Sequence, residues 1–482
     1  MPAPKPTSWL ERLWSSIAER GQSGAGPDLA VPPLDRARLL AEALLSERGE
    51  ASGAAVAREL HAALRDMAPD DRLAFARFLA AGFMPNAAKL RAAAEAYLAD
   101  PTPELAARLS DAADPPRQEL LRRMNLSPGG TASLVAMRQE LLAWLRDNPE
   151  LKPLDADLRH LLASWFNRGF LELKRIDWQT PAATLEKLIA YEAVHEIQGW
   201  DDLRRRVGPD RRCFGFFHPA LPSEPLIFVE VALVEGLAAS VQPLLAADAE
   251  DDPAHSRARA REAAADTAIF YSISNCQEGL RGVSFGNFLI KQVVEELKAE
   301  LPRLTRFSTL SPVPGFRRWL EKRLAEPETL YPDERDALLQ AAPEEGDPNA
   351  TLQTLLRMDN WWETAAIAKA LRKPLSRLCA VYLTGAPGKG SPDPVARFHL
   401  GNGARLERIN WLGNTAPRGM RESCGIMVNY LYDLPTIEAN HEAYVRDGLV
   451  VRSPAVETLM TLPPEPVRSS RLPSRLARMR GG

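Results

Sequence analysis

The chain has few cysteines, no long apolar run and almost no net charge, and each shortage excludes a class of protein. The four cysteines among 482 residues form no CxxC pair, which indicates a reducing, cytoplasmic setting and not a secreted disulfide scaffold. A formal net charge of -3 argues against a general nucleic-acid binder. The best apolar run, 226–241, is interrupted by Glu230 and Glu235, so we expect no membrane-spanning helix and no membrane partner. The cysteines are Cys213, Cys276, Cys379 and Cys424.

The sequence also lacks the residue spacing of a metal site. Its seven histidines show neither an HExxH motif nor any paired spacing, and no cysteine pair stands beside them. We therefore expect no zinc. The histidines are His61, His160, His195, His218, His255, His399 and His441.

The length predicts more than one domain, because a single hydrophobic core rarely grows beyond about 250–300 residues. A leader rich in Pro, Gly and Ser, residues 1–35, is expected to be flexible, and its amphipathic start fits either a frayed helix or a transit-like segment. Residues 36–205 have a helical pattern and 206–460 a mixed one. A basic, Pro-broken tail, 461–482, is predicted to be disordered, with a partner-binding tail as the second interpretation. The fold class is α+β.

The first region shows apolar residues at steps of three and four, which is typical of amphipathic helices. Pro and Gly residues separate the segments, and Thr131 is of a type that caps a helix start. The pattern predicts a helical bundle, whose apolar stripes suggest self-association. The expected helices are 36–48, 53–68, 70–83, 87–100, 131–148, 158–176 and 180–197.

The second region alternates between strand-like and helical stretches. Runs rich in aromatic and β-branched residues predict strands at 213–219, 225–234, 266–274 and 306–311. A helix is expected over 284–301, another beginning at Pro312, and more helix within 325–381. The segments 396–413 and 423–434 are strand-like again.

A glycine-rich turn lies between a predicted strand that ends near Ser274 and an amphipathic helix, in QEGLRGVSFGNFLIKQVVEEL (277–297). Glycine lets a ligand approach the backbone, and the free N–H groups of a helix start favour a pyrophosphate. The segment has neither the Lys–Ser/Thr pair of a P-loop nor a GxGxxG motif. A purely structural turn remains the alternative.

Two single residues could carry chemistry. Ser311 stands before Pro312 in STLSPVPGFRRWL (308–320), so its hydroxyl either caps a helix or contacts a substrate carbonyl or carboxylate, with Ser308 as a second candidate. His399, in RFHLGNGARLERINW (397–411), is either a proton donor or acceptor near neutral pH or an ordinary core residue. The residues alone leave both choices open.

Five segments, in this order, resemble the malonyl-CoA decarboxylase family over about residues 210–435. They are HPALPSEPLIFVEVAL (218–233), FYSISNCQEGLRGVSFGNFLIKQVVEEL (270–297), FSTLSPVPGFRRWL (307–320), and FHLGNGARLERINW (398–411) with RGMRESCGIMVNYLY (418–432). The resemblance implies a helical N-terminal domain followed by an acyl-CoA-binding catalytic domain of the GNAT fold. It also implies a homo-oligomer, either a dimer or a tetramer, and a role in fatty-acid metabolism.

The resemblance further implies the site residues. Its catalytic serine and histidine fall on Ser311 and His399, which would also contact malonyl-CoA. Animal members carry an acidic residue where this chain has Ser284. The acyl-CoA-binding stretch falls on Arg281, Gly282, Val283, Ser284, Phe285, Gly286 and Asn287.

The activity so implied is a carboxy-lyase that converts malonyl-CoA to acetyl-CoA and carbon dioxide, with no cofactor. Ser311 would stabilise the enolate, and His399 would protonate it. Two alternatives stay open at this point. One is a CoA-dependent acyltransferase of the GNAT type, which needs an acceptor, and the other is a non-catalytic scaffold that senses acyl-CoA.

Overall fold

The computed structural model describes residues 31–246, 256–283, 289–326, 329–342, 347–386 and 388–461. Most of the predicted leader and nearly all of the predicted tail lie outside these ranges. Within them, no helix combines the length and the apolar character that crossing a bilayer requires. The chain divides into two compact units. The first draws on Met1–Leu233, Ala247–Ala265 and Phe270–Leu304, and the second on Val234–Ala246, Asp266–Ile269 and Thr305–Gly482.

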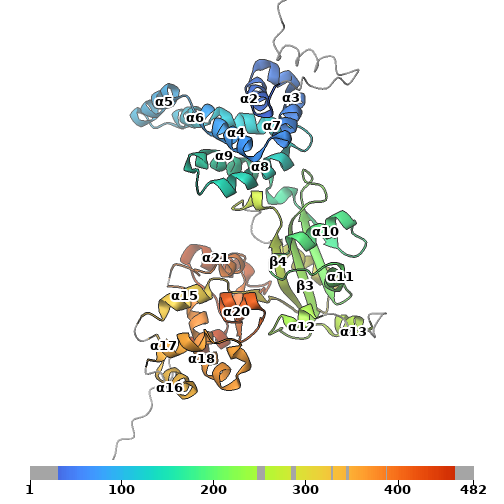
Figure 1. Cartoon of the computed structure of the whole chain (residues 1–482), viewed down its shortest axis with the longest axis vertical. Coiled ribbons are helices and arrows are strands. Elements are labelled where there is room, and N and C mark those ends of the chain that lie inside the picture. Colours follow the sequence, from blue (N-terminus) through green and yellow to red (C-terminus); the bar gives the residue numbers. More distant parts are fainter. Residues whose placement is uncertain are drawn as a thin grey trace, which may run out of the picture. The chain divides into compact units, whose positions relative to one another are not determined.

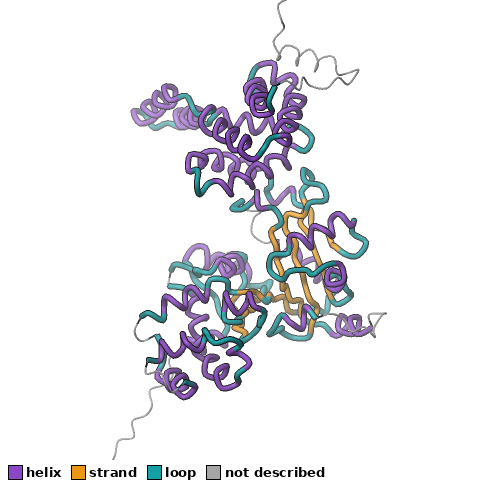
Figure 2. The backbone as a smooth tube through the Cα atoms, in the orientation of Figure 1, coloured by secondary structure: helices purple, strands orange, loops and turns teal. Residues whose placement is uncertain are grey.

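The first unit begins with a helical region (Figures 1 and 2). Proline occupies the first turn of several of these helices, where its missing N–H costs nothing, and side chains such as Asn86 and Thr102 cap others. The helices are α2 (Pro33–Leu44), α3 (Glu47–Asp66), α4 (Pro69–Gly82), α5 (Ala87–Ala99), α6 (Pro103–Ala113), α7 (Pro116–Asn125), α8 (Gly130–Trp144), η1 (Pro149–Leu151), α9 (Lys152–Trp165) and η2 (Arg168–Phe170).

Strands follow within the same unit. β1 (Glu172–Ile176) pairs antiparallel with β2 (Arg211–Phe217), and β2 pairs antiparallel with β3 (Pro225–Val234). β4 (Thr267–Asn275) is the next strand in this order. Apolar side chains of α10 (Ala182–Tyr191) and α11 (Trp200–Arg206) share one buried cluster with side chains of these strands. The remaining helices of this unit are α13 (Ser256–Ala264), η3 (Glu278–Leu280) and α14 (Leu289–Glu300), whereas α12 (Gln242–Leu245) belongs to the second unit.

The second unit places short strands among helices. β8 (Met427–Leu431) pairs antiparallel with β5 (Arg306–Thr309), β6 (Ser311–Pro312) and β7 (Arg405–Asn410). Its longest helix, α18, is buried along much of its length. The helices are α15 (Phe316–Arg323), α16 (Pro332–Ala341), α17 (Pro348–Leu355), η4 (Trp361–Glu363), α18 (Ala365–Thr384), α19 (Pro394–Gly401), α20 (Pro417–Ser423), α21 (Ile437–Asp447) and α22 (Pro454–Met460).

The α+β class is confirmed, because a helical region precedes one built from strands and helices. The strands predicted at 225–234 and 266–274 are present as β3 and β4. The domain ranges 36–205 and 206–460 stay predictions, as does the GNAT-like character of the second range.

Four local predictions are wrong. The segment 158–176 is not one helix, because its end forms β1, which takes its hydrogen bonds from β2. Thr131 does not cap α8; the cap position is Gly129, and the Thr131 hydroxyl donates to Asn125. No helix begins at Pro312, since Ser311 and Pro312 pair with β8 and the next helix starts only at Phe316. His399 lies on a helix, α19, and not on a strand.

Candidate active site

Ser311 and His399 lie next to each other inside the second unit. Strand pairing with β8 fixes the backbone of Ser311, opposite Val428. The Ser311 Oγ donates a hydrogen bond to Thr309 Oγ1 over 2.9 Å and lies 3.1 Å from His399 Nε2. Ser311 and His399 are only 5% and 3% exposed, so the contact is shielded from water.

Tyr432 holds the other side of the imidazole. Its hydroxyl lies 2.8 Å from His399 Nδ1, and the ring of Tyr430 stacks on the imidazole at a centroid separation of 4.8 Å. Tyr430 and Tyr432 lie at the end of β8 and just beyond it, so the strand that pairs with Ser311 also orients His399. Both ring nitrogens therefore have a defined partner.

The hydrogen bonds also assign the proton on the imidazole. A serine hydroxyl has one proton, and the Ser311 proton points to Thr309 Oγ1. The His399 Nε2 then carries the N–H and donates to Ser311, while Nδ1 accepts from the Tyr432 hydroxyl. The resting tautomer has its proton on the nitrogen that faces Ser311.

Burial keeps this group of side chains uncharged. It lowers the pKa of His399 from 6.5 to about 3, because a buried imidazolium would lose its hydration. It also raises the pKa of the Tyr432 phenol well above its ordinary value. At neutral pH the imidazole is thus neutral and the phenol keeps its proton.

The expected acyl-CoA-binding stretch begins in the first unit, directly after η3. Arg281, Gly282 and Val283 are described, whereas Ser284, Phe285, Gly286 and Asn287 lie outside the described residues. Gly282 has a φ of +78°, with open space where a Cβ would stand, which fits a residue that leaves the backbone accessible.

Helix α8 supports the turn that leads into this stretch. The guanidinium of Arg138, 2% exposed, donates to the carbonyls of Gly279 and Arg281 over 2.7 and 2.9 Å. A Cβ at Gly279 would lie 2.0 Å from the Val135 carbonyl oxygen, so only glycine permits this approach. The helical region thus fixes the start of the predicted stretch.

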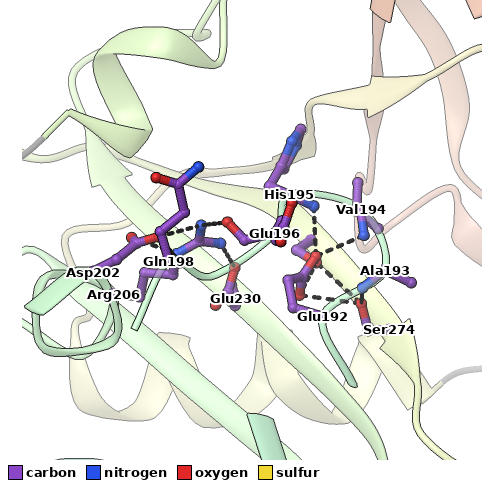
Figure 3. A network of polar contacts seen from close by, with 11 residues as sticks. Glu192, Ala193, Val194, His195, Glu196, Gln198, Asp202, Arg206, Glu230 and Ser274 are labelled. Carbon is purple, nitrogen blue, oxygen red and sulfur yellow. Dashed lines mark hydrogen bonds and ion pairs between the residues drawn. The ribbon is translucent and has the colours of Figure 1, made fainter. Parts of the chain in front are cut away.

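A buried polar network, which we call the Glu192–Arg206 network, supports the end of β4 before that turn (Figure 3). The Glu192 carboxylate accepts hydrogen bonds from the hydroxyls of Ser272 and Ser274 and from two backbone N–H groups that follow it. Arg206 donates to Glu230 over 3.0 Å and to Asp202 over 3.0 Å. Burial raises the pKa of Glu230 to about 8.

The structure gives the two candidate serines different hydrogen-bond partners. It also adds Thr309 and Tyr432 to the site, which the sequence analysis did not name. Ser308 Oγ donates to the Tyr430 carbonyl over 3.0 Å, so it serves the strand backbone, whereas Ser311 contacts His399. Thr309 and Tyr432 lie within the segments that carry the family resemblance, but nothing in those segments marks them as partners of Ser311 and His399. Among the described residues, no group of three or more His, Cys, Asp or Glu could hold a metal ion.

Two family models match the chain. One describes the malonyl-CoA decarboxylase C-terminal domain and matches residues 169–470, and the other describes the N-terminal domain of the same family and matches residues 83–166. Together they cover the helical region from α5 onward and the strands that follow it.

The chain is also similar in sequence to malonyl-CoA decarboxylases of animals. The chain is 42% identical over 343 residues to the mitochondrial malonyl-CoA decarboxylase of Anser anser anser, covering 69% of this chain and 66% of that protein. It is 38% identical over 366 residues to the mitochondrial enzyme of Rattus norvegicus, covering 73% of each. The chain thus spans slightly less than two thirds of the goose protein. Because these relatives are mitochondrial, the cytoplasmic setting stays a prediction.

Solved structures agree with this grouping. The malonyl-CoA decarboxylase of Rhodopseudomonas palustris is 50% identical and superposes with a TM-score of 0.77, covering 88% of this chain and 99% of that one. The enzyme of Cupriavidus metallidurans is 38% identical, with a TM-score of 0.67, covering 89% and 98%. From these matches over most of its length, the chain belongs to the malonyl-CoA decarboxylase family of carboxy-lyases.

Proposed function

We propose that this chain converts malonyl-CoA to acetyl-CoA and carbon dioxide at Ser311 and His399. The observation that carries the proposal is the buried chain of hydrogen bonds from Thr309 through Ser311 and His399 to Tyr432. It presents one hydroxyl and one N–H group side by side, which are the two donors that a decarboxylation through an enolate requires.

The reaction breaks one carbon–carbon bond and forms one carbon–hydrogen bond. The electron pair of the bond to the departing carboxylate moves into the thioester, whose carbonyl oxygen becomes the enolate oxygen. Carbon dioxide leaves, and the enolate carbon then takes one proton. The net reaction consumes one proton from solvent, and the thioester itself serves as the electron sink.

In this proposal, Ser311 turns its hydroxyl from Thr309 to the thioester oxygen, where negative charge develops. A positioned donor at such an oxygen is worth about 3–4 kcal/mol of the activation free energy. Thr309 holds the hydroxyl until the substrate arrives, so the group is in place before the reaction begins.

His399 delivers the proton to the carbon. A carboxylate within about 4–6 Å favours the charged form of an imidazole, so the malonyl group itself offsets the effect of burial on the pKa of His399. The imidazole then holds a second proton, which it passes to the enolate carbon while Tyr432 keeps the ring in place. Positioned general acids of this kind contribute about 10²–10⁴-fold in rate.

The stretch Arg281–Asn287 is proposed to bind the CoA portion of the substrate. Exchanging Gly282 for valine introduces a side chain at a positive φ, where L-residues are strained. We expect Gly282→Val to raise the KM for malonyl-CoA. Gly236 also has a positive φ, 68°, with open space around it, so Gly236→Val is the matched control that leaves the KM unchanged.

The decisive experiment supplies purified protein with malonyl-CoA and no acceptor, and measures released carbon dioxide. We expect turnover by the unchanged chain and a loss of about 10²-fold or more in kcat for Ser311→Ala and for His399→Asn. Ser308→Ala, which changes a buried serine of the neighbouring strand, should retain turnover. Turnover only after an amine or alcohol is added would indicate an acyltransferase, and calorimetry without acyl-CoA binding would indicate a scaffold.

A further inference from the structure

A buried carboxylate caps the helix that carries His399. Asp393 is fully buried, and its Oδ1 accepts hydrogen bonds from the backbone N–H groups of Val395 and Ala396, each over 3.0 Å. Its second oxygen, Oδ2, accepts a hydrogen bond from the Tyr382 hydroxyl over 3.3 Å. One carboxylate oxygen therefore caps the start of α19, while the other binds a side chain of another helix, α18.

The same carboxylate also contacts the loop that follows Ser311. The backbone N–H of Gly315, between β6 and α15, donates to Asp393. The loop packs so closely there that a Cβ at Gly315 would stand 2.1 Å from the Tyr382 hydroxyl and 3.6 Å from Asp393 Oδ2. Asp393 thus joins three segments, namely the start of α19, the loop after Ser311, and α18 through Tyr382.

We propose that Asp393 is a positioning residue that sets the distance between Ser311 and His399, because it holds the first turn of α19 against the loop after Ser311. The proposal rests on the function assigned above to these two residues. It goes further, because it names a side chain that contacts neither Ser311 nor His399 in the structure and still controls their geometry.

The helix transmits this effect as a rigid element. Asp393 and His399 are separated by less than two helical turns, about 9 Å at 1.5 Å per residue. The Ser311–His399 contact of 3.1 Å is already near the long end of the usual range, so a small displacement of α19 breaks it. A misplacement of about 1 Å in an active site can cost about 10²-fold in rate.

A second helix of the same unit offers a matched control. α17 has eight residues, like α19, and also starts with an aspartate cap followed by proline, Asp347–Pro348. Asp347 is exposed, and its carboxylate accepts from the N–H groups of Asn349 and Ala350 in its own helix. Changing each cap in turn shows whether the loss of an aspartate cap lowers activity in general, or only when that cap belongs to the helix that carries His399.

The first test is therefore Asp393→Asn beside Asp347→Asn. Asparagine keeps an oxygen that can accept from the helix N–H groups, but its amide nitrogen cannot accept from Gly315 or Tyr382. We expect Asp393→Asn to lower the kcat for malonyl-CoA by about 10²-fold while the KM stays within about threefold. Asp347→Asn should leave both constants unchanged.

The second test uses the close approach at Gly315. Gly315→Ala places a methyl group against the Tyr382 hydroxyl, pushes the loop away from Asp393 and should lower kcat. In Gly315→Ala/Tyr382→Phe the hydroxyl is gone and the nearest ring atom lies 3.2 Å from the new methyl group, so part of the lost kcat should return. A purely additive loss in the double variant would contradict the proposed contact.

Three outcomes are distinguishable. If the unchanged chain turns over malonyl-CoA and Asp393→Asn does so equally well, the positioning role is wrong and the proposed function stands. If the unchanged chain releases no carbon dioxide, the proposed function is wrong, and a crystal structure of Asp393→Asn still decides the inference. Separation of Ser311 Oγ from His399 Nε2 in that structure supports the positioning role, and an unchanged contact overturns it.

Discussion

Each unit buries one group of polar side chains, and the two groups differ in the hydrogen bonds that compensate for the lost contact with water. The site around His399 is a chain in which each side chain has one or two neutral partners. The Glu192–Arg206 network contains a guanidinium, several carboxylates and two serines, and it links a loop, α11, β3 and β4 (Figure 3). The site uses few bonds to orient one imidazole, whereas the network uses many bonds to join segments.

The comparison shows that burial favours the neutral form of an ionisable side chain when no full opposite charge lies beside it. This holds for a base such as His399 and for an acid such as Glu230. Among the residues that the structure describes, no carboxylate pairs with His399, and burial lowers its pKa to about 3. Glu230 shares the single charge of Arg206 with Asp202, and its pKa rises to about 8. We therefore expect changes in the network to affect stability first and changes in the site to affect turnover first.

The largest effect is expected when the network loses its cation. Arg206 is 3% exposed and donates to Asp202, Glu230 and the Glu196 carbonyl, so Arg206→Met removes these three hydrogen bonds and the positive charge beside two carboxyl groups, although Asp202 keeps the bond from the Gln198 N–H. We expect the free energy of unfolding to fall by about 3–5 kcal/mol, measured by urea denaturation.

An exposed ion pair of the same unit provides the control for this prediction. Arg77 and Glu150 are each about half exposed, with a contact of 3.0 Å. Arg77→Met should cost less than about 1 kcal/mol, because water screens such pairs. Equal losses for the two variants would refute the idea that the network stabilises its unit.

The next effect is expected in the site, and it concerns turnover. Tyr432→Phe removes the hydroxyl that holds His399 Nδ1 and leaves the ring packing intact. We expect kcat to fall about 10–100-fold, by analogy with the loss of the hydrogen-bond partner that orients a metal-bound imidazole. Tyr331, whose ring stacks against Arg377, is the matched control, and Tyr331→Phe should keep the kcat. An unchanged kcat in Tyr432→Phe would show that Tyr432 does not orient the imidazole for catalysis.

The same contrast explains which features the sequence could reveal. The run 225–234 predicts β3 with its observed bounds, because a short run dominated by apolar and β-branched residues, with Glu230 as its one charged residue, is typical of a buried strand. Ser311 and His399 were found through long ordered motifs that resemble a family. Their contact with each other is what the structure adds.

Some secondary-structure predictions were wrong because hydrogen bonding between strands that are distant in sequence overrode the local sequence signal. Ser311–Pro312 has the form of a helix start, yet β8 pairs with it and the helix begins after Gly315. Asp393–Pro394 has the same form and α19 does begin there, although the segment 396–413 was expected to be strand-like. Tyr432 lies in the segment 418–432 that carries the family resemblance, but that segment does not mark it as the partner of His399, because the contact joins residues 33 positions apart.

A smaller effect is expected on stability in acid. Above about pH 6.5 the imidazole of His399 is neutral in both the folded and the unfolded chain, so it contributes no pH dependence. Below that pH the unfolded chain binds a proton that the fold excludes down to about pH 3, so the free energy of unfolding falls. We expect His399→Asn to reduce this loss by about 2 kcal/mol between about pH 6.5 and pH 4.5, measured by denaturant unfolding. Ser311→Ala keeps the imidazole and should keep the loss; an identical acid loss in His399→Asn would contradict the burial argument.

The smallest effect has the opposite sign and belongs to the network. Because the pKa of Glu230 is about 8 in the fold and ordinarily 4.5, the folded chain keeps a proton that the unfolded chain releases between these values. The free energy of unfolding contributed by Glu230 therefore falls as the pH rises through this window. Glu230→Gln keeps an oxygen that accepts from Arg206 and removes the titration, so between about pH 6 and pH 7 it should lose about 1 kcal/mol less than the unchanged chain. If Glu230→Gln and the unchanged chain lose stability in parallel over that range, Glu230 is ionised in the fold, and burial does not neutralise this carboxylate as it neutralises His399.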